Sequence, residues 1–174
     1  MEVPGLGTLT KQKGTGWYVS EPIAIPMLGG QQCRIALEGY QDDPRPEDFH
    51  VAIANFLVGT PDVLRAADEA LFAYYKDMEE YWLEDGEEPI ESADELWKLV
   101  ELGDEPLVQR RDGGDQGIYI SLDGNCEWEP EHGLQIVLKN GLRVNKLGEY
   151  DSHLTNSDAY DDPEYENVIY PPRG

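Results

Sequence analysis

The densest group of reactive side chains lies in the run Cys-Glu-Trp-Glu-Pro-Glu-His-Gly, residues 126–133. A second histidine, His153, follows in a downstream loop. Thiols, carboxylates and imidazoles are the groups that bind zinc or form a cysteine–histidine nucleophilic pair. Cys126, Glu131, His132 and His153 are therefore the candidate residues for catalysis or metal binding.

Three interpretations of this group compete. Structural zinc sites usually show close ligand pairs such as C-x₂₋₄-C or H-x₃₋₅-H, and both spacings are missing here. A nucleophilic pair requires an exposed Cys126 within hydrogen-bond reach of His132. We favour the third interpretation, a structural one. In it Cys126 and Trp128 share a parity and pack inward, His132-Gly133 turns the chain, and no metal or cofactor is expected.

The chain is strongly acidic. Its 174 residues include 36 Asp and Glu against 13 Lys and Arg, a formal net charge of −23. This argues against nucleic acid or an anionic membrane as the main partner, because both bind cationic protein surfaces. Residues 62–105 carry a net charge of −13 and residues 147–174 carry −6, whereas residues 106–146 are nearly balanced. The charge is thus expected to lie largely apart from the reactive group.

An acidic surface has two interpretations. It can serve solubility alone, or it can dock a cationic partner through electrostatic steering and aromatic anchors. The candidate contact residues lie on the second predicted helix and in the loop after it: Glu69, Glu80, Glu84, Asp85, Glu87, Glu88 and Glu91.

Hydrophobic periodicity predicts one α+β domain over residues 1–174. Residues 1–45 read as strands that include a hairpin through Gly29-Gly30, residues 46–103 as helices, and residues 107–147 as strands with a hairpin turn at Asn140-Gly141. Residues 148–174 form an acidic tail that either lies over the body through its tyrosines or frays. We expect an antiparallel sheet, made of the N-terminal hairpin and a C-terminal meander, packed against about three helices on one face.

Local signals place the helices. Pro46 opens the first, which has one apolar stripe at Phe49, Ala52, Ile53, Phe56 and Leu57. The second is predicted to run without a break from Thr60-Pro61-Asp62 to Trp82. A capping box at Ser92 and Glu95 opens the third, with Leu99 and Val100 facing inward and Gly103 closing it. In the C-terminal half, Asp123-Gly-Asn125 is expected to be a turn.

The N-terminus lacks the features of a secretory signal, and no apolar run approaches the roughly 18 residues that span a bilayer. Two cysteines, Cys33 and Cys126, are too few for a disulfide framework. We therefore expect a cytoplasmic protein with reduced thiols.

The run from Tyr119 to Val144 resembles the signature of an uncharacterised bacterial domain family, which has a C-x-W-(D/E)-x-E-H-G-(L/V) motif, a strand and a (D/N)-G turn. Residues 150–160 and 46–75 are also similar to its members. The resemblance makes Trp128, Glu131, His132 and Gly133 the family-marking positions, and it implies no established activity. Domains of this look occur among small bacterial proteins suspected as immunity factors near toxin loci, so it also implies a binding role.

The leading hypothesis is a bacterial protein that neutralises a basic protein partner, such as a toxin, through its acidic helical face and tail. One alternative is a small enzyme or metal-binding domain centred on Cys126, Glu131, His132 and His153. Another is a structural module of a larger assembly, which predicts a large exposed apolar patch. The hypotheses assign the motif differently. If the charge binds, the motif is scaffold, and if the motif is the site, the charge serves solubility.

Overall fold

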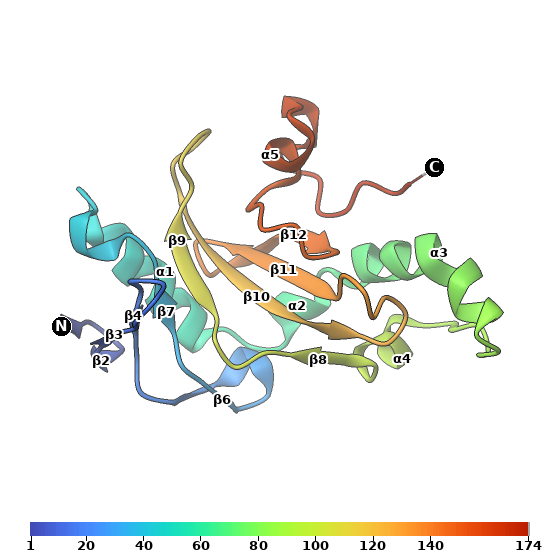
Figure 1. Ribbon diagram of the computed structural model, residues 1–174, viewed down its shortest axis with the longest axis horizontal. Helices are drawn as coiled ribbons and strands as arrows, with labels where there is room; N and C mark the ends of the chain where they lie inside the picture. The colour runs from blue at the N-terminus through green and yellow to red at the C-terminus, as the bar shows by residue number, and fades with distance from the viewer. Residues whose placement is uncertain (174) are drawn as a thin grey trace.

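The computed structural model describes residues 1–173 and has an α+β fold built on a central sheet (Figure 1). The strands of this sheet follow the order β12-β11-β10-β9-β7-β4-β3. Strand β8 pairs with the C-terminal end of β10, and β9 pairs with its N-terminal part. Its strand pairs are antiparallel except for β7 with β9. Two small hairpins, β1–β2 and β5–β6, lie outside it. The predicted class is confirmed.

The strands are β1 (Glu2–Val3), β2 (Gly7–Thr8), β3 (Thr10–Lys11), β4 (Tyr18–Val19), β5 (Ile23–Ile25), β6 (Gln31–Cys33), β7 (Ala36–Leu37), β8 (Val100–Leu102), β9 (Leu107–Arg110), β10 (Ile118–Cys126), β11 (Leu134–Lys139) and β12 (Arg143–Gly148). The helices are α1 (Pro46–Val58), α2 (Asp62–Arg65), α3 (Asp68–Glu84), α4 (Ala93–Trp97) and α5 (Asn156–Tyr160). Short 3₁₀ turns are η1 (Pro26–Leu28), η2 (Tyr40–Asp42) and η3 (Pro163–Tyr165).

Two local predictions about the helices hold. Helix α1 starts at Pro46 and buries Phe49, Ala52, Ile53 and Phe56, so its apolar stripe faces the sheet. The Ser92 hydroxyl accepts a hydrogen bond from the Glu95 N–H and caps α4. Both features depend on neighbouring residues alone, which explains why the sequence is enough to find them.

Two helix boundaries differ from the prediction. The helix expected from residue 60 to 82 is divided into α2 and α3 at Ala66 and Ala67, and Arg65 spans the break by pairing with Asp68 at 3.0 Å. The helix opened by Ser92 ends at Trp97 rather than at Gly103. The reason is that Val100 begins β8, whose backbone pairs with the end of β10.

The N-terminal hairpin forms as β5 and β6, but it is a separate two-stranded sheet. The extended chain after this hairpin is interrupted at Arg34 and Ile35, between β6 and β7. Arg34 N–H there donates to the Asp104 carbonyl, and Ala36 N–H donates to the Pro106 carbonyl. These bonds align β7 parallel to β9 and so give the sheet its one parallel pair.

The two faces of β10 and β11 have different coverings. Ile118, Ile120 and Leu122 belong to the main core under the helices, whereas Tyr119 packs with Val137 and Leu154 in a second cluster on the other face. The turn expected at Asp123-Gly-Asn125 is instead part of β10. Gly124 is needed there because a Cβ atom would lie 2.4 Å from the Glu101 carbonyl oxygen of β8. The predicted turn at Asn140-Gly141 does join β11 to β12.

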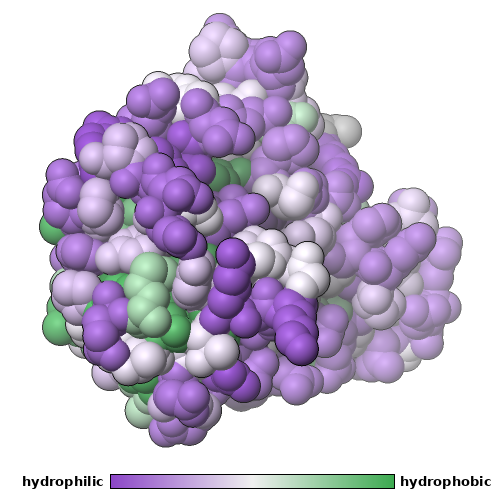
Figure 2. Space-filling model, turned by 60° about the vertical axis from the view of Figure 1, so that its left-hand side comes forward, coloured by the Kyte–Doolittle hydropathy of each residue, from purple (hydrophilic) through white to green (hydrophobic). Residues whose placement is uncertain are grey.

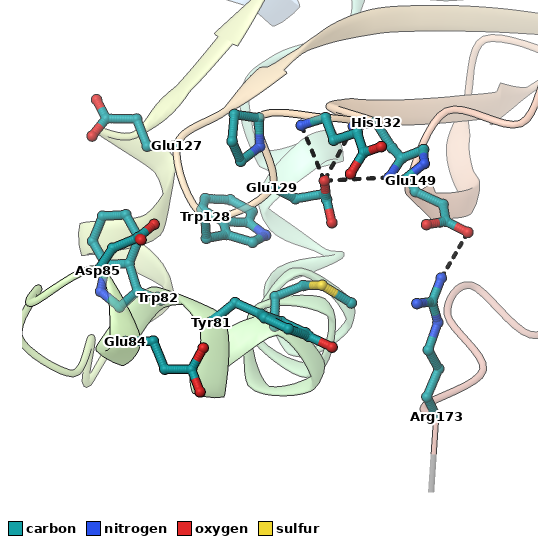
Figure 3. A pocket seen from close by; sticks show the side chains of 13 residues that line it. Tyr81, Trp82, Glu84, Asp85, Glu127, Trp128, Glu129, His132, Glu149 and Arg173 are labelled. Carbon is teal, nitrogen blue, oxygen red and sulfur yellow. Dashed lines mark hydrogen bonds and ion pairs between the residues drawn. The ribbon is translucent and has the colours of Figure 1, made fainter.

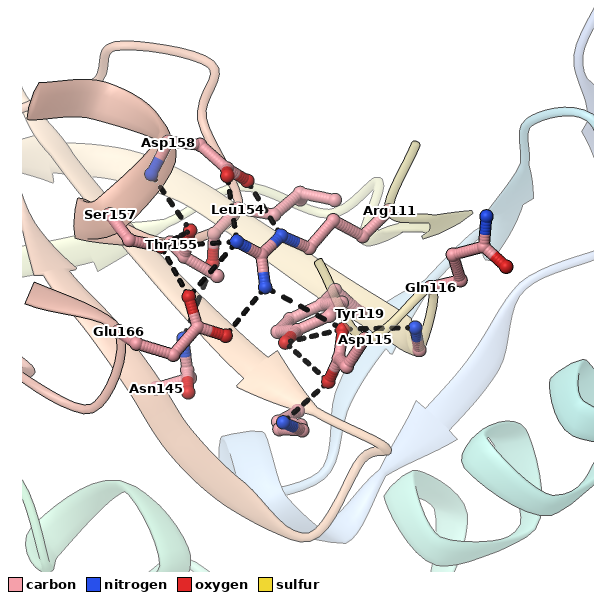
Figure 4. A network of polar contacts seen from close by, with 12 residues as sticks. Arg111, Asp115, Gln116, Tyr119, Asn145, Leu154, Thr155, Ser157, Asp158 and Glu166 are labelled. Atoms are coloured by element: carbon pink, nitrogen blue, oxygen red, sulfur yellow. Dashed lines mark hydrogen bonds and ion pairs between the residues drawn. The ribbon is translucent and has the colours of Figure 1, made fainter. Parts of the chain in front are cut away.

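The acidic tail lies over the body. The tilted rings of Tyr170 and Tyr74 pack with their centroids 5.5 Å apart, and the Tyr170 hydroxyl donates to Asp77 of α3. The tail is also held through Arg111, which is only 4% exposed. Its guanidinium donates to Asp158 at 2.7 Å and to Glu166 at 2.6 Å (Figure 4). Hydrogen bonds from Arg111 lower the pKa of both carboxyls.

The surface reflects the composition. Figure 2 shows hydrophilic side chains over most of one face, with hydrophobic ones gathered in a limited area. Among residues 1–173, no helix has both the length and the apolar character to cross a bilayer.

We predict that Arg111→Gln destabilises the fold by about 1–3 kcal/mol in urea unfolding and makes the C-terminal segment sensitive to limited proteolysis. Loss of one partner of a fully buried ion pair costs about 3–5 kcal/mol. We expect a smaller loss than for a fully buried pair because the Asp158 and Glu166 side chains are 37% and 34% exposed. Arg143→Gln, at an exposed strand position, is the control and should change stability by less than about 0.5 kcal/mol. Equal effects of the two substitutions would contradict this role.

Candidate functional site

Residues 126–133 leave the end of β10 and turn into β11, and Cys126 lies at the buried start of this loop. Its side chain is 2% exposed, and its thiol donates to the Gly133 carbonyl at 3.5 Å. The Tyr74 hydroxyl of α3 donates to the same oxygen at 2.9 Å. Burial raises the pKa of the Cys126 thiol to about 12. Cys126 thus has the environment of a packing residue, as the structural interpretation expects, and not that of a nucleophile.

Trp128 is the second buried residue of the loop, with 3% of its surface exposed. Its ring meets Tyr74 and Tyr75 edge-to-face, with centroid distances of 6.0 and 6.3 Å. Its indole Nε1 is buried and has no hydrogen-bond partner among the residues that the structure describes. A buried donor without an acceptor is uncommon and calls for an explanation.

Glu129 holds the turn together. One of its carboxylate oxygens accepts the backbone N–H groups of Glu131 and His132, each at 3.1 Å, and lies 3.3 Å from His132 Nδ1. Glu129 is not one of the candidate residues predicted from the sequence. The signal was its spacing of two and three residues from those N–H groups, the arrangement that side chains use to close turns.

Gly133 ends the loop with φ of 66°, and a Cβ atom there would lie 2.5 Å from the Gly124 carbonyl oxygen. Only glycine fits this position, because both the backbone conformation and the space exclude a side chain. The family-marking positions Trp128 and Gly133 therefore have clear structural roles.

The structure brings together only part of the predicted reactive group. Within residues 1–173, the set of potential metal ligands that lie within 4.8 Å of one another is Glu129, Glu131 and His132. His153 is elsewhere and faces Asp151 at 3.5 Å, while Asp151 also pairs with the buried Lys146 at 2.6 Å. Three such ligands can hold a divalent cation, but the Glu129 oxygen already serves the turn.

The loop borders a hollow of about 500 Å³ at the C-terminal end of α3, which we call the α3-end pocket (Figure 3). Its aromatic lining is Tyr81, Trp82 and Trp128. Its charged lining consists of six carboxylates and one arginine: Glu84, Asp85, Glu127, Glu129, Glu131, Glu149 and Arg173. His132 also faces it. The expectation that charge and motif lie apart is therefore wrong. The sheet topology places the loop beside the end of α3, although the two are more than forty residues apart in sequence.

All seven predicted contact acids are exposed. Glu84 and Asp85 line the α3-end pocket, and the backbone of Glu88 closes the loop after α3 by accepting the Trp82 indole N–H at 2.8 Å. Glu69 and Glu91 border a shallower hollow near the start of α3. The acidic surface thus extends along α3 and is most concave at its C-terminal end.

We predict that Gly133→Ala destabilises the fold by more than about 2 kcal/mol, because it adds a backbone clash to the cost of a left-handed conformation. Gly86→Ala is the matched control. Gly86 has φ of 87°, but a Cβ atom there meets no atom within 4 Å, so the expected cost is about 1 kcal/mol. Urea unfolding of both variants separates the clash from the conformational cost. The prediction is wrong if the two values agree.

We also predict that Cys126 resists alkylation in the folded protein. With a pKa of about 12, about one Cys126 thiol in ten thousand is ionised at pH 8, and burial blocks access as well. Mass spectrometry after iodoacetamide treatment at pH 8 should show no rapid adduct at Cys126 until urea is added. Rapid modification of Cys126 under native conditions would restore the nucleophile interpretation.

Comparison with known families gives one match. The family described as Domain of unknown function (DUF6985) matches residues 5–154. No curated protein and no solved structure matches the chain. Because the matched region covers most of the sequence, the chain belongs to the DUF6985 family of domains of unknown function.

Proposed function

We propose that this chain is an acidic binding protein that neutralises a basic protein partner, as an immunity protein neutralises a toxin. The observation that carries the proposal is the convergence of carboxylates from α3, from the 126–133 loop and from the end of β12 on one concave, partly aromatic surface. Charge alone is common on soluble proteins, whereas charge gathered around aromatic side chains in a hollow is typical of recognition surfaces.

The exposed acids supply the long-range part of binding. Complementary charges raise association rates well above those of neutral surfaces, and salt screens the effect over about 8–10 Å. The aromatic side chains supply short-range contact, and Tyr81 is 65% exposed beside the acids. A basic protein would therefore be attracted to this face first and anchored at the α3-end pocket.

The enzyme alternative has no comparable support within residues 1–173. Cys126 is buried and His153 lies outside the group around His132. We therefore advance the binding function alone.

The direct test is isothermal titration of the full chain with the product of a neighbouring gene, chosen for its basic sequence. We expect micromolar or tighter binding that weakens as salt rises from low to physiological concentration. Failure to bind at low salt would overturn the proposal for that partner. Binding that ignores salt would contradict the role of the acidic face.

A charge-matched pair of variants locates the surface. The test variant neutralises four acids at and after the end of α3: Glu84→Gln, Asp85→Asn, Glu87→Gln and Glu88→Gln. The control neutralises four exposed acids away from α3 and the tail: Glu21→Gln, Glu38→Gln, Asp42→Asn and Asp112→Asn. We predict an association rate constant about tenfold lower for the test variant and within about twofold of wild type for the control. If both variants lose the same fraction of the association rate constant, the net charge of the chain steers the partner and no particular surface does.

A further inference from the structure

The unpartnered indole N–H of Trp128 belongs to the α3-end pocket. Figure 3 shows its nitrogen on the edge of the ring that lies between Glu129 and Tyr81, both of which line the pocket. The side chain is 97% buried, and every other buried side-chain nitrogen or oxygen among residues 1–173 has a partner. The nitrogen itself is covered, so a ligand that brings a hydrogen-bond acceptor into the pocket would satisfy this donor once the neighbouring side chains move aside.

The rest of the lining requires the same ligand to be cationic. Glu84 and Asp85 line the hollow at the end of α3, and Glu127 and Glu131 line it from the loop. All four are exposed. Carboxylates that share a small hollow repel one another, and a cation placed among them relieves that repulsion.

The chain itself shows which cation suits this site. Arg173 lies at the rim of the pocket, and its guanidinium pairs with Glu149 at 2.7 Å. Guanidinium groups also stack on aromatic faces and present a planar fork to carboxylates, which the ammonium of lysine does not. The exposed ring of Tyr81 and the half-buried ring of Trp82 supply such faces.

We propose that the α3-end pocket receives an arginine side chain of the basic partner, with its guanidinium paired to carboxylates of the lining and the Trp128 indole N–H donating to a peptide carbonyl beside it. An arginine residue within a peptide carries both required groups, the cation and the acceptor. This assignment rests on the proposed function, since it names the contact through which the basic partner is held.

The test uses the full chain and three blocked tripeptides with glycine on either side of arginine, citrulline or lysine. Citrulline keeps the shape of arginine but has no charge. The indole N–H resonances of the tryptophans are followed by NMR, and Trp128→Phe identifies the one from Trp128. We expect the arginine peptide to shift the Trp128 resonance and to bind about tenfold tighter than the citrulline peptide, because charge-assisted hydrogen bonds are the stronger ones. The lysine peptide should bind less tightly than the arginine peptide.

Variants provide the second readout. Glu84→Gln with Asp85→Asn should weaken the arginine peptide about tenfold, whereas Glu21→Gln with Glu38→Gln, which removes the same charge elsewhere, should leave it within about twofold. Trp128→Phe keeps the ring and removes the N–H, and should weaken binding about fivefold. If its circular dichroism departs from wild type, the resonance shift in the wild-type chain decides.

The outcomes separate this inference from the proposed function. If the basic partner binds in a salt-dependent way but arginine and citrulline peptides behave alike, the arginine pocket is wrong and the binding function stands. If the arginine peptide shifts Trp128 while no basic partner binds, the pocket stands and the neutralising function fails. An unshifted Trp128 resonance at saturating arginine peptide overturns the assignment.

Discussion

The Gly133 carbonyl is the point on which the arrangement of the site depends. It accepts the Tyr74 hydroxyl from α3 and the Cys126 thiol from the end of β10. Both donors are buried, so neither can exchange its bond for one to water without exposing the core. This contact fixes the end of the sheet against the middle of α3. Gly133 also lies against the Gly124 carbonyl of β10, so closely that a Cβ atom would be 2.5 Å from its oxygen. The 126–133 loop and the acidic end of α3 face each other as a consequence.

This scaffold brings like charges together. Folding gathers carboxylates from three separate parts of the chain around the α3-end pocket, although like charges repel one another. Gathering like charges in this way does not stabilise the fold. The buried Trp128 N–H has the same character, because an acceptor beside it would have improved the fold. Neither the gathered carboxylates nor the unpartnered N–H stabilises the fold. Both are expected at a site that binds a ligand with a positive charge and a hydrogen-bond acceptor.

The parts of this structure that could be predicted are those decided by neighbours in sequence. The α1 stripe, the Ser92 cap and the Asn140-Gly141 hairpin follow from periodicity and turn chemistry. Gly124 looked like a turn because glycine usually marks one, yet here it admits the β8 backbone from a distant segment. The α3-end pocket could not be predicted from the sequence for the same reason. Its walls are distant in sequence, so a count of charge along the chain placed the acids and the motif apart.

The structure also changes the choice between motif and charge as the functional feature. The sequence presents them as alternatives, but Trp128 packs the fold with its ring and faces the α3-end pocket with its nitrogen. The contrast with Arg111 shows what is incomplete there. Arg111 is surrounded by the carboxylates of Asp158 and Glu166, with Asp115 at 3.6 Å, so that charge is balanced inside the chain. In the α3-end pocket a single arginine faces six carboxylates. The fold therefore completes one guanidinium site with its own residues and leaves the other with carboxylates to spare.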